Sequence, residues 1–404
     1  MAKKSAAAKS GVAPNAPDPV EFDDNNEPEH VQLSKKDLSA AVVFNTDWTV
    51  ETVTLQTSNI VLNPNFQRRD AWSIEKKSKF IESLILGLPV PPIILAELKH
   101  AKGKFIVIDG KQRLLSILQF WGKNPESPNN SYALRGLDVR DDLIKTNFTR
   151  LTTTPECADD YSALRNQPIR TVVIRNWPTD EFLHLVFLRF NTGSVRLSAQ
   201  ELRQALKPGE YTRRVDAYAA DNAALRKLFG ANKPDPRMRD TEILGRHIAF
   251  VNFIESYPGR LKTFLDTSFE ELNSDWATWG PTVEQQFEAF DAALEGLIDV
   301  FSEKAVARRP GSRLLNKALL DPLLYYFERQ DVRAAAKKHG AAFKAAYAEM
   351  LKGEEFQKSI GLDTASTDST VYRFAELGRV ISKTCKVNVK VPHKAKGAVG
   401  IVLK

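Results

Sequence analysis

Residues 104–120 constrain the fold more than any other part of this 404-residue sequence. Residues 104–108, KFIVI, form a nearly continuous apolar run, which is typical of a strand buried on both faces. Asp109 and Gly110 end the run, and the apolar residues that follow have helical spacing. Because glycine allows the backbone to turn sharply, the sequence predicts a buried strand, a tight corner at Gly110 and a helix.

The predicted corner carries the polar motif Asp109-Gly110-Lys111-Gln112-Arg113. The first amide groups of a helix lack helical acceptors and attract anions. The guanidinium of Arg113 can donate two hydrogen bonds to phosphate oxygens, Lys111 adds a point charge, and Gln112 offers both a donor and an acceptor. We expect Asp109 to hold a water, a magnesium ion or a ribose hydroxyl, or to cap the helix. The motif alone fits an anion site and a plain turn with a solvated arginine equally well.

Two other polar segments are candidates for ligand contact. Residues 63–69, NPNFQRR, place two adjacent arginines at a loop-to-helix junction, which suits phosphate contacts and also fits a charged turn. Residues 187–193, FLRFNTG, form a loop between two expected helices, the second of which begins with the capping box of Ser198 and Glu201. A simple helix break with a good cap explains this second segment as well.

The hydrophobic pattern divides the chain into four regions. Residues 1–33 are rich in Ala, Lys and Pro and then in acids, and we expect a disordered arm. Residues 40–215 mix strand and helix patterns, whereas helical periodicity dominates residues 216–382. Residues 383–404 form a basic tail in which CKVNVKV is an expected strand and AVGIVLK its hairpin partner. The fold class is therefore α+β: an α/β domain followed by an all-helical domain.

The same patterns predict individual elements. Ser73 is expected to cap a helix that stops at Gly87. The alternation in WTVETVTL and NIVL predicts short strands between Trp48 and Leu62. Further elements are expected as strands at PIILAEL and residues 169–174, a helix from Thr179, and helices near 241–256, 281–302, 313–329, 331–351 and 368–383.

Charge and cysteine content exclude several classes of protein. The net charge of +7 equals the seven cations between residues 379 and 404, a stretch without acids, so the remaining chain is neutral. Net charge therefore gives no evidence for a basic groove, but the tail suits salt-dependent contact with a DNA backbone, or only solubility. The candidate DNA contacts are Lys386, Lys390, Lys394 and Lys396. Two cysteines, no signal peptide and no apolar run of about 20 residues indicate a cytoplasmic protein without membrane partners.

Taken together, the motifs resemble one protein family. NPNFQRRDAW, SLILGLPVPPIIL, VIDGKQRLLSILQFW and FLRFNTGSVRLSAQELRQA resemble the N-terminal domain of GmrSD-type restriction endonucleases, which belongs to the ParB and sulfiredoxin-like superfamily. The resemblance continues through RMRDTEILGRHIAF and FQKSIGLDTASTDSTVYRFAELGRVI, and it covers about residues 60–382. It implies a ParB/sulfiredoxin-like fold for the N-terminal domain. Lys111 departs from the family, in which glutamine is commonest at this position.

The resemblance also implies roles for individual residues. Gly110 and Arg113 match a segment that binds nucleotide phosphates, and the whole motif is tied to nucleotide hydrolysis. The implied catalytic residues are Asp109, Gln112 and Arg113, with Asp109 also a ligand of Mg²⁺. The implied nucleotide contacts are Gln67, Arg68, Gly110, Lys111, Arg113 and Asn191. Arg237, Arg239, Asp240 and Glu242 fall in a further family-like segment, where an ion-pair network and a ligand contact are equally compatible with the sequence.

The resemblance leads to a functional expectation with one rival. Family members usually append a metal-dependent histidine nuclease domain, but the six histidines here are widely separated, so we expect no nuclease centre. P-loop, dinucleotide, zincin and hydrolase motifs are also absent from the sequence. We expect a component of a bacterial restriction or phage-defence system that binds and hydrolyses a nucleoside triphosphate with Mg²⁺. Its expected partners are DNA and a separately encoded nuclease. The alternative is a non-catalytic DNA- or protein-binding module of the same fold.

Overall fold

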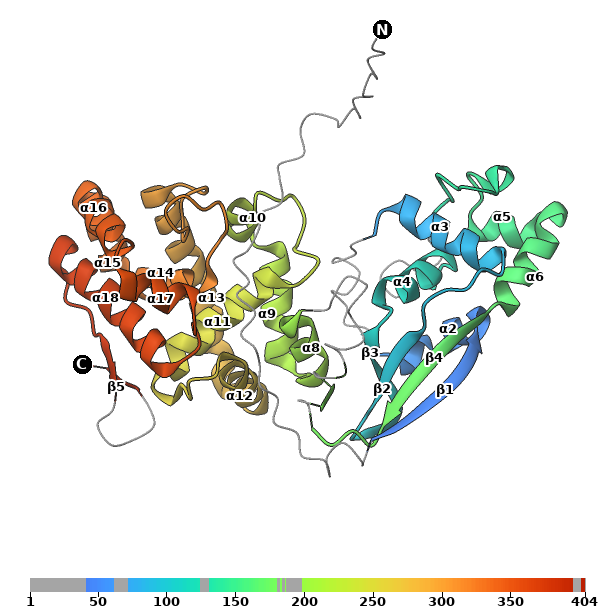
Figure 1. The fold of residues 1–404 in the computed structure, drawn as a ribbon, viewed down its shortest axis with the longest axis horizontal. Coiled ribbons are helices and arrows are strands. Elements are labelled where there is room, and N and C mark those ends of the chain that lie inside the picture. Colours follow the sequence, from blue (N-terminus) through green and yellow to red (C-terminus); the bar gives the residue numbers. More distant parts are fainter. Residues whose placement is uncertain are drawn as a thin grey trace, which may run out of the picture.

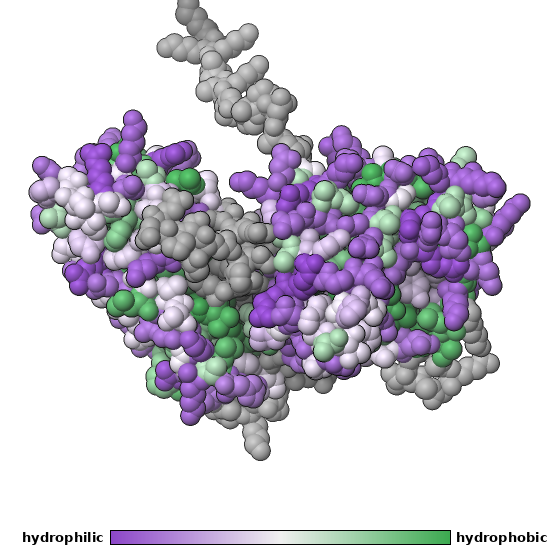
Figure 2. Space-filling model, turned by 180° about the vertical axis from the view of Figure 1, so that it is seen from behind, coloured by the Kyte–Doolittle hydropathy of each residue, from purple (hydrophilic) through white to green (hydrophobic). Residues whose placement is uncertain are grey.

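The computed structural model describes residues 41–61, 72–123, 131–179, 182–183, 186, 198–394 and 401–403. A sheet with its covering helices forms one half, and a larger assembly of helices forms the other (Figure 1). The fold is mixed α+β, which confirms the predicted class. Among the described residues, no helix is long and apolar enough to cross a bilayer. Seen from behind, hydrophilic residues are spread over both halves, with smaller hydrophobic areas between them (Figure 2).

The four-stranded sheet has the order β1-β4-β2-β3. β2 and β4 are parallel, and the two outer pairs, β1 with β4 and β2 with β3, are antiparallel. The strands are β1 (Val42–Thr49), β2 (Ile93–Leu98), β3 (Ala101–Asp109) and β4 (Pro168–Arg175). As predicted, β3 is buried on both faces, because Phe105 and Val107 enter one core cluster whereas Ile106 and Ile108 enter another.

Helices cover both faces of the sheet. One core cluster packs below α2 (Val50–Leu55), α3 (Ile74–Ile85), α4 (Lys111–Phe120), α5 (Phe148–Thr153) and α6 (Ala158–Asn166). The other cluster contains Leu202 of α8 (Ala199–Leu206) and Trp177. Short 3₁₀ turns occupy Gln56–Asn59, Asp141–Leu143 and Pro155–Cys157. The expected cap of α3 is present, since Ser73 accepts a hydrogen bond from the amide of Lys76.

The strands expected in WTVETVTL and NIVL are largely wrong. β1 ends at Thr49, whose side chain caps α2 by accepting a hydrogen bond from the amide of Thr52. Val50, Val53 and Thr54 are buried with helical spacing, so the apparent alternation belongs to the short helix. Of NIVL, Ile60 makes only an isolated bridge to Phe105.

The second half contains helices from α9 onward, among the described residues. They are α9 (Glu210–Asp221), α10 (Ala223–Phe229), α11 (Arg239–Phe253), α12 (Leu261–Ser274), α13 (Trp276–Phe301), α14 (Lys317–Phe327), α15 (Gln330–Lys338), α16 (Gly340–Met350), α17 (Glu354–Gly361) and α18 (Thr367–Cys385), with a 3₁₀ turn at Ile254–Ser256. The single helix expected over 331–351 is two helices, α15 and α16. The break at His339 allows Val332 and Phe343 to enter the same core.

The C-terminal segment packs against the helical half. α18 continues through Cys385, and residues 386–391 have no regular secondary structure, so the strand expected over CKVNVKV is not formed. Val389 is buried in the core, and the carbonyl of Lys390 accepts a hydrogen bond from Tyr326. β5 (Pro392–Lys394) then pairs with β6 (Ile401–Leu403) in an antiparallel hairpin.

The close contact between α18 and this segment yields a test. A methyl group on Gly378 would lie 2.5 Å from Val391 Cγ1 and 2.6 Å from the Tyr326 hydroxyl. We predict that Gly378→Ala lowers the free energy of unfolding by about 1–3 kcal/mol, because the segment must shift. Urea denaturation measures this change. Gly340→Ala is the control, since nothing lies within 4 Å of the new methyl group. Equal effects of the two substitutions would contradict the described packing.

Candidate functional site

The corner between β3 and α4 has the geometry that the sequence predicts. Gly110 is the N-cap of α4 and has the left-handed conformation, φ 95° and ψ 12°. A Cβ atom at this position would lie 3.2 Å from both the Cα atom of Ile93 and Nη2 of Arg113. Both the backbone angle and the space therefore favour glycine, and this brings the first turn of α4 directly under the end of β3.

Arg113 and Asp109 form one unit at this corner. Arg113 Nη2 donates to Asp109 Oδ2 at 2.8 Å and to the carbonyl of Pro92 at 3.0 Å. The two side chains are 8% and 17% exposed, respectively, so this ion pair is largely buried. Among the described residues, Arg113 Nε is buried without a hydrogen-bond partner, and both hydrogen bonds of the guanidinium come from Nη2. The guanidinium is thus anchored through a single nitrogen.

Lys111 and Gln112 are also held by neighbouring groups. Lys111 Nζ lies 2.8 Å from Glu201 Oε1, and the two side chains are only 9% and 7% exposed. Gln112 Oε1 accepts a hydrogen bond from the backbone amide of Trp72 at 3.2 Å. Because its oxygen is fixed in this way, the amide nitrogen of Gln112 is the end that remains to donate elsewhere. The sequence did not reveal Glu201 as the partner of Lys111.

The structure brings only part of the predicted site together. Asp109, Gly110, Lys111, Gln112 and Arg113 converge on the corner. The predicted positions Gln67, Arg68, Asn191 and Lys396 lie outside the described residues, as does most of the helix expected from Thr179. The described part of the chain contains no group of three or more His, Cys, Asp or Glu side chains placed to hold a metal ion.

The candidate DNA contacts lie at the other end of the molecule, where β5 marks the far side of the helical half (Figure 1). Lys386 and Lys390 are exposed on the segment after α18. Lys394 is exposed too, but its ammonium pairs with Asp368 Oδ1 at 2.8 Å. This cationic group is therefore separate from the corner.

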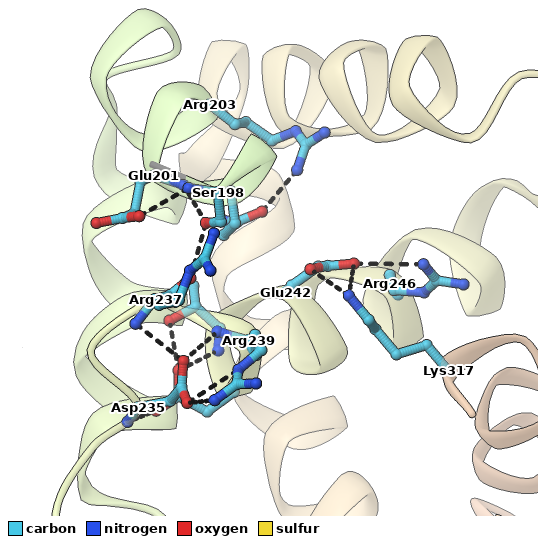
Figure 3. Close-up of polar contacts among 12 residues, drawn as sticks. Ser198, Glu201, Arg203, Asp235, Arg237, Arg239, Glu242, Arg246 and Lys317 are labelled. Atoms are coloured by element: carbon cyan, nitrogen blue, oxygen red, sulfur yellow. Dashed lines mark hydrogen bonds and ion pairs between the residues drawn. The ribbon is translucent and has the colours of Figure 1, made fainter. Parts of the chain in front are cut away.

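Glu201 also forms part of the cap of α8. Its Oε2 accepts a hydrogen bond from the amide of Ser198 at 2.7 Å, and its own amide donates to Ser198 Oγ at 3.1 Å. The same hydroxyl donates to the backbone carbonyl of Arg237 at 2.7 Å. The predicted capping box is confirmed, and it connects α8 to the segment before α11 (Figure 3).

That segment is a compact hydrogen-bonded turn. The carboxylate of Asp235 accepts from the backbone amides of Arg237 and Arg239 and from the Arg239 guanidinium, at 2.6 Å for Nη2. Asp240 accepts from the amides of Asp235 and Thr241. Arg239 and Asp240 therefore stabilise the turn, and Arg237 contributes its backbone amide and carbonyl (Figure 3).

Glu242 belongs to a buried ion-pair network. Its carboxylate lies 3.0 Å from Lys317 Nζ and 3.4 Å from Arg246 Nη1 (Figure 3). Arg246 also pairs with Asp321. Burial opposes the charge of Glu242, but attraction by Lys317, Arg246 and Arg203 outweighs it and lowers the pKa of Glu242 to about 2. Of the two alternatives for this family-like segment, these contacts favour the ion-pair network.

A concavity of about 440 Å³ lies beside the same turn. It is bounded by α10, residues 230–236 and the start of α11, with Leu225, Phe229 and Pro236 among its apolar lining. The sequence does not reveal this concavity, because its walls come from short segments whose apolar residues show no pattern beyond that of a helical core.

A comparison with known proteins finds a similarity in the N-terminal part of the chain. Residues 50–206 match the GmrSD restriction endonuclease, N-terminal domain. This stretch of the chain is therefore similar to that domain. The match includes the whole β3–α4 corner and ends at Leu206, the last residue of α8. No curated protein and no solved structure matches the chain significantly. The ParB/sulfiredoxin-like fold and the extension of the resemblance beyond residue 206 remain predictions.

The corner geometry predicts a specific sensitivity to substitution at Gly110. Gly110→Ala should lower the free energy of unfolding by about 2–4 kcal/mol, since the new methyl group combines backbone strain with close contacts. The control is Gly103→Ala, which has a φ of 79° but nothing within 4 Å, so it should lose only about 1–2 kcal/mol. Chemical denaturation compares the two. Equal losses would argue against a tight approach between Gly110 and β2.

The depressed pKa of Glu242 predicts acid sensitivity. A carboxyl that ionises more readily when folded stabilises the protein above its unfolded pKa near 4.5, and this contribution disappears as pH falls to about 2. We expect the free energy of unfolding to fall by roughly 3 kcal/mol in that pH window. In Glu242→Gln, the free energy of unfolding should depend less on pH there. Urea unfolding at a series of pH values provides the measurement. The control Asp368→Asn removes an exposed carboxylate and should leave the slope nearly unchanged; a similar flattening there would refute the assignment.

Proposed function

We propose that this protein is a nucleotide-binding component of a bacterial restriction or phage-defence system, and that its N-terminal domain hydrolyses a nucleoside triphosphate. The observation that carries the proposal is the β3–α4 corner, in which a family-matched segment places two cations, a carboxylate and a glycine N-cap together. The GmrSD name supplies the restriction context.

The start of α4 offers hydrogen-bond donors to a phosphate group. Gly110 provides no side-chain cap, and within the described residues the amides of Gln112 and Arg113 donate to no protein group. Such amides at a helix start attract anions, helped by the helix dipole. Arg113 Nη1 adds a cationic donor beside them. A phosphate group therefore has both neutral and charged donors at one place.

Mg²⁺ typically binds through one or two carboxylates together with substrate phosphates and water. Asp109 is the carboxylate of the corner, and its partly exposed side chain fits this donor set for an ion that arrives with the nucleotide. When bound, Mg²⁺ would neutralise charge on the phosphate oxygens. Asp109 would hold the ion or its water while remaining the counter-ion of Arg113.

The remaining residues have positioning roles in this proposal. Arg113 stabilises negative charge on the phosphates, because its guanidinium is already oriented by Asp109 and the carbonyl of Pro92. Gln112, fixed through its oxygen by Trp72, directs its amide nitrogen as a donor toward water or phosphate. Gln67, Arg68 and Asn191 are proposed as further contacts on the strength of the family resemblance. DNA is the proposed partner of the exposed Lys386 and Lys390, with Lys394 and Lys396, and a separate nuclease would cut it.

One observation favours the non-catalytic alternative. Arg113 and Lys111 are both largely buried and already paired with Asp109 and Glu201. Buried cations in such pairs often serve the fold alone, and the same domain would then bind DNA or a partner protein without hydrolysis. The two functions differ in whether the corner responds to nucleotide.

Hydrolysis by the purified chain distinguishes them. We expect phosphate release from ATP or GTP with Mg²⁺, and a loss of about 100-fold or more in Asp109→Asn and Arg113→Lys, because each removes charge or geometry at the corner. A colorimetric phosphate assay measures the rate. Glu82→Gln is the matched control, since Glu82 is a buried carboxylate of the same domain that accepts from the amides of residues 138–140. It should retain hydrolysis.

Absence of hydrolysis and of nucleotide binding in a folded wild-type protein, checked by a thermal melt, would leave the binding-module function. DNA binding that is unaffected by nucleotide and by Asp109→Asn would then support that alternative.

A further inference from the structure

α8 is attached to both halves of the molecule. Leu202 packs in the core beside the sheet, and Glu201 pairs with Lys111 at the start of α4. On the other side, Arg203 pairs with Asp266 of α12 at 2.7 Å, and Ser198 donates to the carbonyl of Arg237. In Figure 1, α8 lies between the sheet with its helices and the helical half. Any displacement of α8 therefore changes contacts in both halves.

The contacts run in an unbroken series from the corner to the turn at residues 235–240. Lys111 binds one oxygen of Glu201, the other oxygen holds the amide of Ser198, and the Ser198 hydroxyl holds the carbonyl of Arg237. Lys111 and Glu201 are each less than 10% exposed, so neither charge can be left to bulk water if the pair separates. A second anion that approaches Lys111 therefore competes with Glu201 for the same ammonium group.

We infer that Lys111, Glu201 and Ser198 form an interdomain latch that a phosphate at the β3–α4 corner releases. Lys111 is the first residue of α4, so a phosphate at the helix start competes with Glu201 for its ammonium. When Lys111 turns to the phosphate, Glu201 loses its counter-ion, the cap of α8 weakens, and the bond from Ser198 to Arg237 is strained. The phosphate part of this inference rests on the proposed function, whereas the latch itself does not.

Phosphate binding and the strength of the latch must affect each other in the same direction. If phosphate binding weakens the latch, then weakening the latch must strengthen phosphate binding by the same factor. Glu201→Gln keeps an oxygen for the amide of Ser198 but removes the charge that holds Lys111. This variant should therefore bind Mg²⁺–ATP or Mg²⁺–GTP more tightly, by roughly tenfold. A merely structural role of Glu201 predicts unchanged or weaker binding.

The turn at 235–242 supplies a readout that needs no nucleotide. The amides of residues 235, 237, 238, 239, 241 and 242 all donate hydrogen bonds within the turn, so they should exchange slowly with deuterium. Loss of the latch loosens the turn and speeds this exchange. Mass spectrometry of the peptide that covers the turn measures the rate in the full chain.

The first arm of the experiment compares latch variants without nucleotide. Lys111→Met and Ser198→Ala should speed exchange in residues 235–242 by roughly tenfold, whereas Ser198→Thr, which keeps the hydroxyl, should remain near the wild type. Lys79→Met is the matched control, because Lys79 pairs with Asp138 at the surface of the same domain. If Lys111→Met fails to fold, Lys111→Met with Glu201→Gln removes both buried charges and takes its place. Unchanged exchange in the folded latch variants overturns the inference.

The second arm adds Mg²⁺ with ATP or GTP and measures both affinity and exchange. Nucleotide should speed exchange at 235–242 in the wild type and have no such effect in Glu201→Gln, which binds more tightly. If nucleotide binds but exchange changes equally in both proteins, release of the latch by phosphate is refuted. If neither nucleotide binds the wild type, the proposed function fails, and the first arm alone decides whether the latch exists.

Discussion

The ion pair between Lys111 and Glu201 is the interaction on which the arrangement of this molecule depends. It joins the first residue of α4 to the cap of α8, two elements that are 90 positions apart in the sequence. Its two charges are almost completely buried, and separating them would leave the carboxylate of Glu201 without this counter-ion, a change that costs about 3–5 kcal/mol in other proteins. The pair therefore fixes α8 against the sheet half, and α8 in turn carries bonds to the helical half.

The corner beside this pair combines structural and chemical demands. Gly110 is needed because the backbone has a positive φ and lies close to Ile93. Arg113 is needed because Asp109 and the carbonyl of Pro92 require a donor there. The same constraints orient an arginine, a helix start and a carboxylate toward one place, which is the arrangement that phosphate chemistry uses. The family match of residues 50–206 adds the restriction context to this arrangement.

The sequence predicted local structure well where one pattern dominated. The buried strand at 104–108, the corner at Gly110 and the capping box at Ser198 were all evident, because each depends on residues close together in the chain. The strand predicted over most of WTVETVTL was wrong. The cap at Thr49 and three buried positions of a short helix together resemble the alternation of apolar and polar residues in a strand. Partners distant in sequence, such as Glu201 for Lys111 and Lys317 for Glu242, could not be read from spacing, because tertiary packing alone brings them together.

An experimental structure with Mg²⁺ and a non-hydrolysable triphosphate would show whether the β3–α4 corner binds the phosphates of a nucleotide. We expect phosphate density about 3 Å from the amides of Gln112 and Arg113 and from Arg113 Nη1, a normal hydrogen-bonding distance. Lys111 should then have turned from Glu201 toward the phosphate. Nucleotide density elsewhere, for example in the concavity beside residues 230–236, with the Lys111–Glu201 pair intact, would contradict the claim.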